Sequence, residues 1–129
     1  MLAVDTNVIV RYLTSDDAEQ FARASALIHH ADVYVSTTVL LETEWVLRRA
    51  YRFSRERIVA ALAAFAGLPR VTLEDPALTG RALDWTRQGM DFVDSLHLAK
   101  AAGCEVFITF DQRFAARANA LSDVRVRAP

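Results

Sequence analysis

Short apolar stretches alternate along the chain with longer segments in which apolar residues recur every three or four positions. The short stretches have the length and β-branched composition of strands, and the longer segments have the period of amphipathic helices. Strands are predicted at residues 2–4, 33–35, 71–73, 106–109 and 124–126, and helices at residues 7–13, 17–30, 38–51, 55–67, 76–88, 92–102 and 112–118. This alternation predicts an α/β fold, a three-layer α/β/α sandwich with a central, mostly parallel sheet of about five strands.

Several predicted helices carry chemical signals at their ends. Asp75 precedes Pro76, which suits the first position of a helix, and Ser54 is a favoured cap for the helix at 55–67. Gly103 has the position of a C-terminal cap for the helix at 92–102. No internal repeat, low-complexity tract or long linker interrupts the pattern. Because 129 residues suffice for one core and not for two, we expect a single domain over residues 1–129.

The composition is that of a compact globular protein, with 53% hydrophobic and 24% charged residues. Fifteen basic and 16 acidic residues give a net charge of −1, so no overall field attracts nucleic acid or a membrane. Lys100 is the only lysine, and the preference for arginine either suits phosphate contacts or reflects the base composition of the genome. The single cysteine, Cys104, excludes an internal disulfide, and we expect it to be a small buried residue.

The start of the chain does not have the pattern of a signal peptide, because Asp5 interrupts the first apolar stretch. The longest apolar run, residues 58–68, is too short to span a bilayer. We therefore expect a soluble, cytoplasmic protein without a membrane partner.

Acidic residues follow two of the predicted strands. Asp5 comes directly after the first strand, and Asp111 comes after the strand at 106–109. Ligands of parallel sheets bind outside the carboxyl ends of the strands, so we expect both carboxylates at the same edge. Alternatively, each aspartate is only the N-cap of the helix that follows it, a position for which Asp is favoured.

Two further acids fall in apolar helices. Glu42 lies one helical turn from Val39 and Val46, where a carboxylate needs a partner or a metal unless its long side chain reaches water. Asp94 lies in a helix that is apolar almost all round, where an unpaired charge is costly. In the alternative reading, Asp91 is the N-cap of that helix and Asp94 reaches back to backbone donors.

These four acids are hard oxygen donors that would repel one another if they were clustered without a cation. An oxygen-only ligand set favours Mg²⁺ or Mn²⁺ over zinc. Such ions polarise a phosphoryl oxygen and generate a hydroxide nucleophile, so the set predicts hydrolysis of a phosphodiester. The four acids are Asp5, Glu42, Asp94 and Asp111.

The ordered set of motifs resembles the PIN-domain ribonucleases over essentially the whole chain, and within them the VapC toxins of toxin-antitoxin pairs. Its carriers are Asp5-Thr6-Asn7, Glu42 in its helix, the segment 91–99 and Thr109-Phe110-Asp111. The resemblance implies that Asp5, Glu42, Asp94 and Asp111 hold Mg²⁺ or Mn²⁺. It also implies that Thr6, Asn7 and Thr109 support the carboxylates or the attacking water. Asp91 is either a fifth acid of the metal pocket or only a helix cap.

The activity that the resemblance implies is that of a metal-dependent endoribonuclease. Water would attack the RNA phosphodiester in line and leave a 5′-phosphate and a 3′-hydroxyl. The resemblance also implies a homodimer and a VapB-like antitoxin, through which operator DNA would be bound indirectly. No histidine is required, and we expect His97 to be a hydrogen-bonded packing residue.

Other phosphate-handling classes fit the residues less well. A phosphatase of the haloacid dehalogenase type needs a second aspartate where this chain has Asn7, and a receiver domain needs a lysine after its last strand, where this chain offers only arginine. The non-enzymatic alternative is a catalytically silent PIN-like module that binds RNA or an antitoxin-like peptide. The presence of all four acids disfavours it.

A basic stretch, residues 48–57, contains five arginines and two aromatic residues. It is either a surface for RNA backbone or antitoxin, or a solvated corner between helices with Tyr51 and Phe53 packed inward. Arg48 also lies four residues after Glu44, which predicts an ion pair on the surface of that helix.

Overall fold

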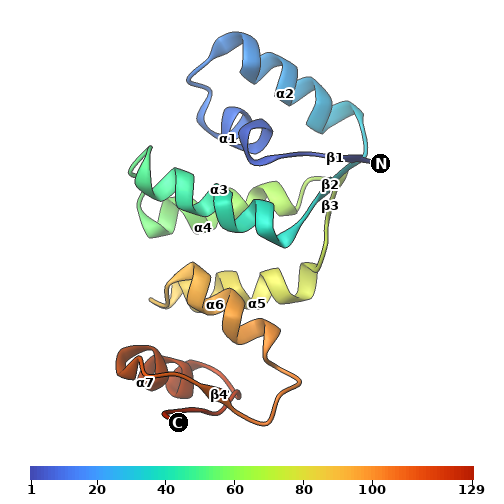
Figure 1. The fold of residues 1–129 in the computed structure, drawn as a ribbon. Helices are drawn as coiled ribbons and strands as arrows, with labels where there is room; N and C mark the ends of the chain where they lie inside the picture. Colours follow the sequence, from blue (N-terminus) through green and yellow to red (C-terminus); the bar gives the residue numbers. More distant parts are fainter. The chain divides into compact units, whose positions relative to one another are not determined.

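The computed structural model describes all residues, 1–129, and they form two compact units, residues 1–76 and 77–129. The alternation of strands and helices follows the sequence pattern (Figure 1). The first unit contains β1 (Leu2–Ala3), α1 (Thr6–Thr14), α2 (Ala18–His30), β2 (Val33–Val35), α3 (Thr37–Arg49), α4 (Arg55–Ala66) and β3 (Val71–Leu73). The helix α5 (Pro76–Arg87) begins at the boundary and is followed by α6 (Phe92–Lys100), β4 (Phe107–Ile108), α7 (Gln112–Leu121) and β5 (Val126–Arg127).

The strands all pair in parallel, as the sequence predicts, but they form two sheets. The first unit has a three-stranded sheet in the order β1-β2-β3, and the second has the two-stranded pair β4-β5. The single sheet of about five strands is therefore corrected to three strands and two. Each strand is only two or three residues long, so each pairing contains few backbone hydrogen bonds.

The core of the first unit is built around β2. Val33 and Val35 are fully buried, as expected for the middle strand of a parallel sheet with helices packed on it. In this unit α1 packs against α2 and α3, and α3 packs against α4 (Figure 1). Their apolar faces meet in a core that includes Ile9, Leu47 and Phe65.

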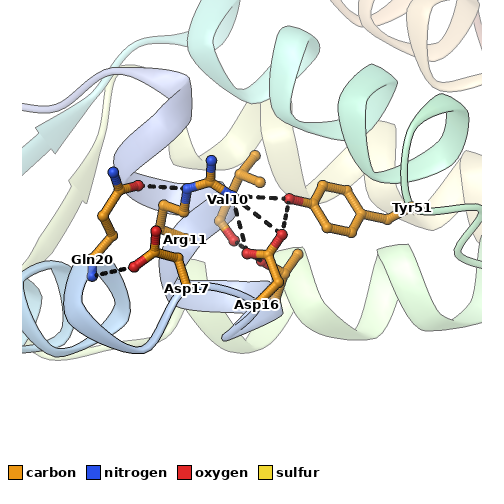
Figure 2. A network of polar contacts seen from close by, with 7 residues as sticks. Val10, Arg11, Asp16, Asp17, Gln20 and Tyr51 are labelled. Carbon is orange, nitrogen blue, oxygen red and sulfur yellow. Dashed lines mark hydrogen bonds and ion pairs between the residues drawn. The ribbon is translucent and has the colours of Figure 1, made fainter.

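A polar network joins α1 to the start of α2 and to the residues after α3 (Figure 2). The Arg11 guanidinium lies 3.0 Å from the Asp16 carboxylate, and the Tyr51 hydroxyl donates to the other Asp16 oxygen at 2.7 Å. Arg11 Nε also donates to Gln20 Oε1 at 2.6 Å. Tyr51 and Phe53 are half-buried, as the reading of a corner between helices predicts.

The second unit packs α5 and α6 through apolar side chains that include Trp85, Phe92 and Leu98, all of them buried. An aromatic contact joins β4 to α7. The rings of Phe107 and Phe114 meet there edge to face, with their centroids 5.4 Å apart. None of the helices in the chain combines the length and the apolar character that crossing a membrane requires.

Three expectations about individual residues are wrong. Gly103 does not cap α6, because the helix already ends at Lys100, where the Ala101 N–H donates to the Leu98 carbonyl at 3.1 Å and tightens the last turn. Cys104 follows in the turns after α6 and is exposed rather than buried. His97 is exposed too, because it lies on the solvent-facing side of α6.

Of the two glutamates of α3, Glu44 departs from the prediction of a surface position, and Glu42 reaches water as the alternative interpretation has it. Glu44 is buried and bonds to Arg48 Nε at 2.9 Å, whereas Glu42 is exposed. The ion pair itself is confirmed, but its carboxylate lies in the core rather than on the surface. The packing of α3 against α1 and α4 sets the rotation of the helix about its axis. The apolar pattern alone does not fix that rotation to within one residue.

Candidate active site

In the first unit, the start of α1 meets the middle of α3. Asp5 follows β1 and is the N-cap of α1, with Oδ1 accepting from the Asn7 N–H at 3.0 Å. The next residue, Thr6, is buried, and its hydroxyl donates to Glu42 Oε1. The structure thus brings Glu42 to the helix that Asp5 begins. Asn7 is exposed and lines a groove of about 440 Å³ between α1 and α2.

In the second unit, two of the predicted acids are helix caps. Asp91 is the N-cap of α6, and its Oδ2 accepts from the backbone N–H groups of Val93 and Asp94 at 3.1 and 3.3 Å. Asp111 is the N-cap of α7, and its Oδ1 accepts from the Phe114 N–H at 2.9 Å. The capping interpretation of these aspartates is therefore correct. It occupies one oxygen of each carboxylate and leaves the other available.

Thr109 shapes the same segment, because its hydroxyl accepts from the Asp111 N–H at 3.0 Å. Asp94 differs from the two capping acids. Its side chain is half-buried in the first turn of α6 and makes no hydrogen bond back to the helix, since Asp91 fills the capping position. Of the three predicted site acids in this unit, Asp94 is thus the one whose carboxylate caps no helix.

The three predicted site acids of the second unit lie close enough for Asp91 and Asp111 to act electrostatically on Asp94. Burial raises the pKa of Asp94 above its usual 3.8, and the negative charges of Asp91 and Asp111 raise it further, while His97 opposes them. A cation placed among these carboxylates would relieve that repulsion. No three His, Cys, Asp or Glu side chains close on one point as the ligands of a bound ion do. The donor set is nevertheless one of hard oxygens, which suits Mg²⁺ or Mn²⁺.

The predicted site residues are divided between the units. The structure joins Thr6 to Glu42 beside the Asp5 cap in the first unit. It places Asp91, Asp94 and Asp111 together, with Thr109, in the second. Phe110, for which no role was predicted, lies beside Asp111 with its side chain 85% exposed.

The sequence profile of the PIN domain matches residues 2–120. The chain belongs to the PIN domain family. The family inferred from the motifs is thus confirmed, and with it the PIN-like α/β fold. PIN domains related to VapC toxins are nucleases, so membership of the family supports a nuclease in general terms. No curated protein matches the chain.

Two solved structures similar to this PIN domain are VapC proteins. VapC20 of Mycobacterium tuberculosis, described as a sarcin-ricin loop cleaving toxin, is 26% identical, with 97% of this chain and 99% of that chain covered and a TM-score of 0.43. VapBC2 from Rickettsia felis, bound to a DNA fragment from its promoter, is 12% identical, with 98% and 97% covered and a TM-score of 0.40.

Proposed function

We propose that this PIN domain, acting as one domain over residues 1–129, is a Mg²⁺- or Mn²⁺-dependent endoribonuclease and the toxin of a VapBC-type pair. The observation that carries the proposal is the match of the PIN domain to residues 2–120, a range that contains all the acids of the predicted site. The charges of Asp91 and Asp111 also act on the partly buried Asp94. Folding alone does not explain the position of Asp94, since Asp91 and not Asp94 caps the helix. In a PIN domain, a bound metal ion and a phosphodiester substrate would explain why these carboxylates lie together.

The metal would be held by Asp5, Glu42, Asp94 and Asp111, with Asp91 as a further acid of the pocket. When bound, Mg²⁺ or Mn²⁺ would supply Lewis-acid stabilisation of the phosphoryl group. We assign the acids of the two units to one site because of the order of the motifs in the family, and not because of a measured distance.

The remaining polar residues position these acids. The Thr6 hydroxyl binds one oxygen of Glu42 and thereby fixes the direction of the other. Thr109 holds the backbone of Asp111, and the caps at Asp5 and Asp91 set the angle at which each carboxylate leaves its helix. Asn7 is placed to hold water near the Asp5 carboxylate. The hydrolysis itself would be the in-line attack of water on the phosphodiester.

The partners we propose follow from the same family motifs. The substrate is RNA. A VapB-like antitoxin inhibits the toxin, and the toxin contacts operator DNA only indirectly, through this antitoxin. The toxin itself would be a cytoplasmic homodimer.

The decisive experiment is the cleavage of a mixed cellular RNA pool by the purified protein. We expect cleavage with Mg²⁺ or Mn²⁺, none with chelator, and none with Asp94→Asn, which keeps the shape of the side chain and removes its charge. Asp123→Asn is the matched control, because Asp123 is an exposed acid outside the site and its loss should leave cleavage intact. Full activity of Asp94→Asn would remove Asp94 from the mechanism. RNA binding without cleavage under any metal would favour the silent binding module.

A further inference from the structure

The helix α3 starts where the middle strand of the first unit ends, and side chains that follow both neighbouring strands bind it. From the β1 side, the Thr6 hydroxyl donates to Glu42 Oε1 in the middle of α3. From the β3 side, Glu74 Oε1 accepts from the Thr37 N–H at the start of α3, at 2.9 Å. All four residues belong to residues 1–76, so both contacts lie within one unit. Glu74 is not among the acids of the predicted site.

The backbone that carries these side chains is fixed by strand pairing at the carboxyl edge of the sheet. The Val4 N–H donates to the Tyr34 carbonyl at 3.1 Å, which ties the end of β1 to β2. The Glu74 N–H donates to the Val35 carbonyl at 2.9 Å, which ties the residue after β3 to the end of β2. Both side-chain contacts on α3 therefore start from backbone that the strand pairing holds in register.

The Glu74 contact satisfies a backbone donor that α3 cannot satisfy itself. The first N–H groups of a helix have no partner within the helix, and the hydroxyl of the N-cap Ser36 accepts from Val39 and not from Thr37. A carboxylate is a suitable acceptor at this place, because the N-terminal end of the helix dipole is positive. Glu74 thus holds the first turn of α3 through a directional bond.

Such a bond matters for Glu42 because apolar packing fixes α3 along its axis less closely than hydrogen bonds do. The helix packs against α1 and α4, and the hydrophobic effect is non-directional, whereas a hydrogen bond tolerates only a few tenths of an ångström. Thr37 and Glu42 are five residues apart on one helix, about 7.5 Å along its axis. A displacement of the first turn is therefore passed on to the Glu42 carboxylate, and it changes the contact with Thr6.

We propose that Glu74 is a positioning residue of the nuclease. By accepting from the Thr37 N–H, it places α3 so that the Glu42 carboxylate meets the Thr6 hydroxyl and directs its other oxygen to the metal. Glu74 acts through Glu42 and is not itself a metal ligand. The consequence for cleavage rests on the ribonuclease function proposed above, whereas the coupling between Glu74 and Glu42 can be measured without metal or RNA.

The ¹³C resonance of the Glu42 carboxyl group, recorded by NMR in chelator at neutral pH, tests the coupling. Thr6→Val removes the hydroxyl bound to Glu42 and defines the shift that loss of this contact produces. We expect Glu74→Ala, which removes the acceptor of the Thr37 N–H, to shift the resonance in the same direction. Glu74→Gln keeps an accepting oxygen on a side chain of the same length and should leave the resonance near its wild-type position.

A second variant keeps the test decisive if Glu74→Ala does not fold. Thr37→Pro removes the N–H instead of its acceptor, and proline is favoured at the first position of a helix. The Thr37 hydroxyl has no hydrogen-bond partner, so its loss removes no other contact of this kind. Thr37→Pro should therefore shift the Glu42 resonance as Glu74→Ala does.

Asp32→Ala is the matched control. It breaks the ion pair with Arg70, 3.0 Å long, which joins the residues before β2 and β3 at the opposite end of the same two strands. This change removes a carboxylate that links the same part of the unit but does not hold α3. The Glu42 resonance and the metal requirement should both stay as in the wild type.

In cleavage, we expect Glu74→Ala to raise the Mg²⁺ concentration for half-maximal activity about two- to tenfold, the range of one hydrogen bond. Thr6→Val should have a similar effect. Because both changes act on the same contact, the double variant should need no more Mg²⁺ than Thr6→Val alone. A residue that served stability only would lower Tm and leave the Mg²⁺ requirement of the folded protein unchanged.

The positioning role is overturned if the Glu42 resonance keeps its wild-type position in Thr6→Val, or in both Glu74→Ala and Thr37→Pro. It is also overturned if Asp32→Ala shifts the resonance as strongly, or if the effects of Glu74→Ala and Thr6→Val on the Mg²⁺ requirement add in the double variant. Metal-dependent cleavage with an unmoved resonance would refute the positioning alone. A coupled resonance without any cleavage by the wild type would refute the ribonuclease and retain the positioning of Glu42 by Glu74.

Discussion

Three aspartates of the candidate site cap helices, and in the function proposed here they would also serve the chemistry. Asp5, Asp91 and Asp111 each accept a backbone hydrogen bond at the start of a helix. A helix N-terminus favours a negative charge, and the capping bond holds the carboxylate in a fixed direction. Capping and metal binding are compatible because a carboxylate has two oxygens. Asp94, which has no capping bond, is the acid most open to change without damage to the fold.

The pH dependence of the free energy of unfolding should reveal that the ionised Asp94 carboxylate is unfavourable in the folded protein. Burial and the charges of Asp91 and Asp111 raise its pKa in the folded protein, so the folded state holds this proton more tightly than the unfolded chain does. In chelator, the contribution of Asp94 to stability should therefore improve as the pH falls from neutral through the raised pKa towards 3.8. Above that range the ionised carboxylate destabilises the fold.

Asp94→Asn should accordingly unfold at the same temperature as the wild type or a higher one at pH 7 in chelator. The difference in Tm between the two proteins should shrink as the pH is lowered. Thermal scans at a series of pH values measure both. A variant that is clearly less stable than the wild type at pH 7 would show that Asp94 has a favourable partner in the folded protein.

We expect Thr6 to affect metal-dependent cleavage by positioning the Glu42 carboxylate. Thr6→Val keeps the shape of a buried side chain and removes the hydroxyl that binds the Glu42 carboxylate. A hydrogen bond contributes about 0.5–1.5 kcal/mol, so we expect the Mg²⁺ concentration for half-maximal cleavage to rise roughly two- to tenfold. Thr6→Ser, which restores the hydroxyl, should restore the metal requirement. An unchanged requirement in Thr6→Val would mean that the bond does not position Glu42.

At the scale of elements, α1 is the helix on which the first half of the candidate site depends. It carries Thr6 and Asn7, and the Asp5 cap begins it. Its other end is held by the network of Arg11, Asp16 and Tyr51 (Figure 2). The helix is thus fixed at its first turn by the site and at its last turn by contacts that involve no site residue.

Loss of the Tyr51 hydroxyl should weaken that attachment in a pH-dependent way. The hydrogen bonds from Tyr51 and Thr14 lower the pKa of Asp16, so the stability they provide is present above 3.8 and is lost as the pH falls through the lowered pKa. Tyr51→Phe should lower Tm at pH 7, and the difference from the wild type should disappear in acid. Tyr34→Phe, on β2, is the control and should not change Tm. A pH-independent loss in Tyr51→Phe would exclude Asp16 as the cause.

The elements themselves could be predicted where their signals are local. Caps at Ser54 and Asp111 and the proline at position 76 begin their helices as expected, because capping depends on a few consecutive residues. The end of α7 could not be predicted. It runs to Leu121, three residues beyond the expected end, and Asn119 exchanges hydrogen bonds of 2.8 and 3.0 Å with Val126 of β5. Such a contact depends on the fold.

The candidate site likewise has features that local sequence predicts and features that depend on packing. The acids after strands could be placed from the sequence, since the strand fixes where the chain turns. The burial of Glu44 could not, because the rotation of α3 is decided by what packs against it. Similarly, the sequence does not show that Phe107 of β4 packs against Phe114 of α7.

For the whole molecule, the proposal distributes one function over two units. Asp5 and Glu42 belong to residues 1–76, and Asp94 and Asp111 to residues 77–129. A metal that needs acids from both would bind only the folded chain, because the unfolded chain holds no such set. Binding of this kind raises the free energy of unfolding by RT ln(1 + [M]/Kd), about 2.7 kcal/mol at a metal concentration one hundred times Kd.

Mg²⁺ should therefore raise the Tm of the whole protein by several degrees, in a manner that saturates with its concentration. Asp94→Asn should lose most of this response, since it removes a ligand without disturbing a cap, and Asp5→Asn should lose it too, although it lies in the other unit. Asp123→Asn should respond like the wild type. If Asp94→Asn responded fully and Asp5→Asn did not, the metal would bind the first unit alone. Equal responses in all four proteins would mean that Mg²⁺ acts only as a general counterion and that the carboxylates hold no specific site.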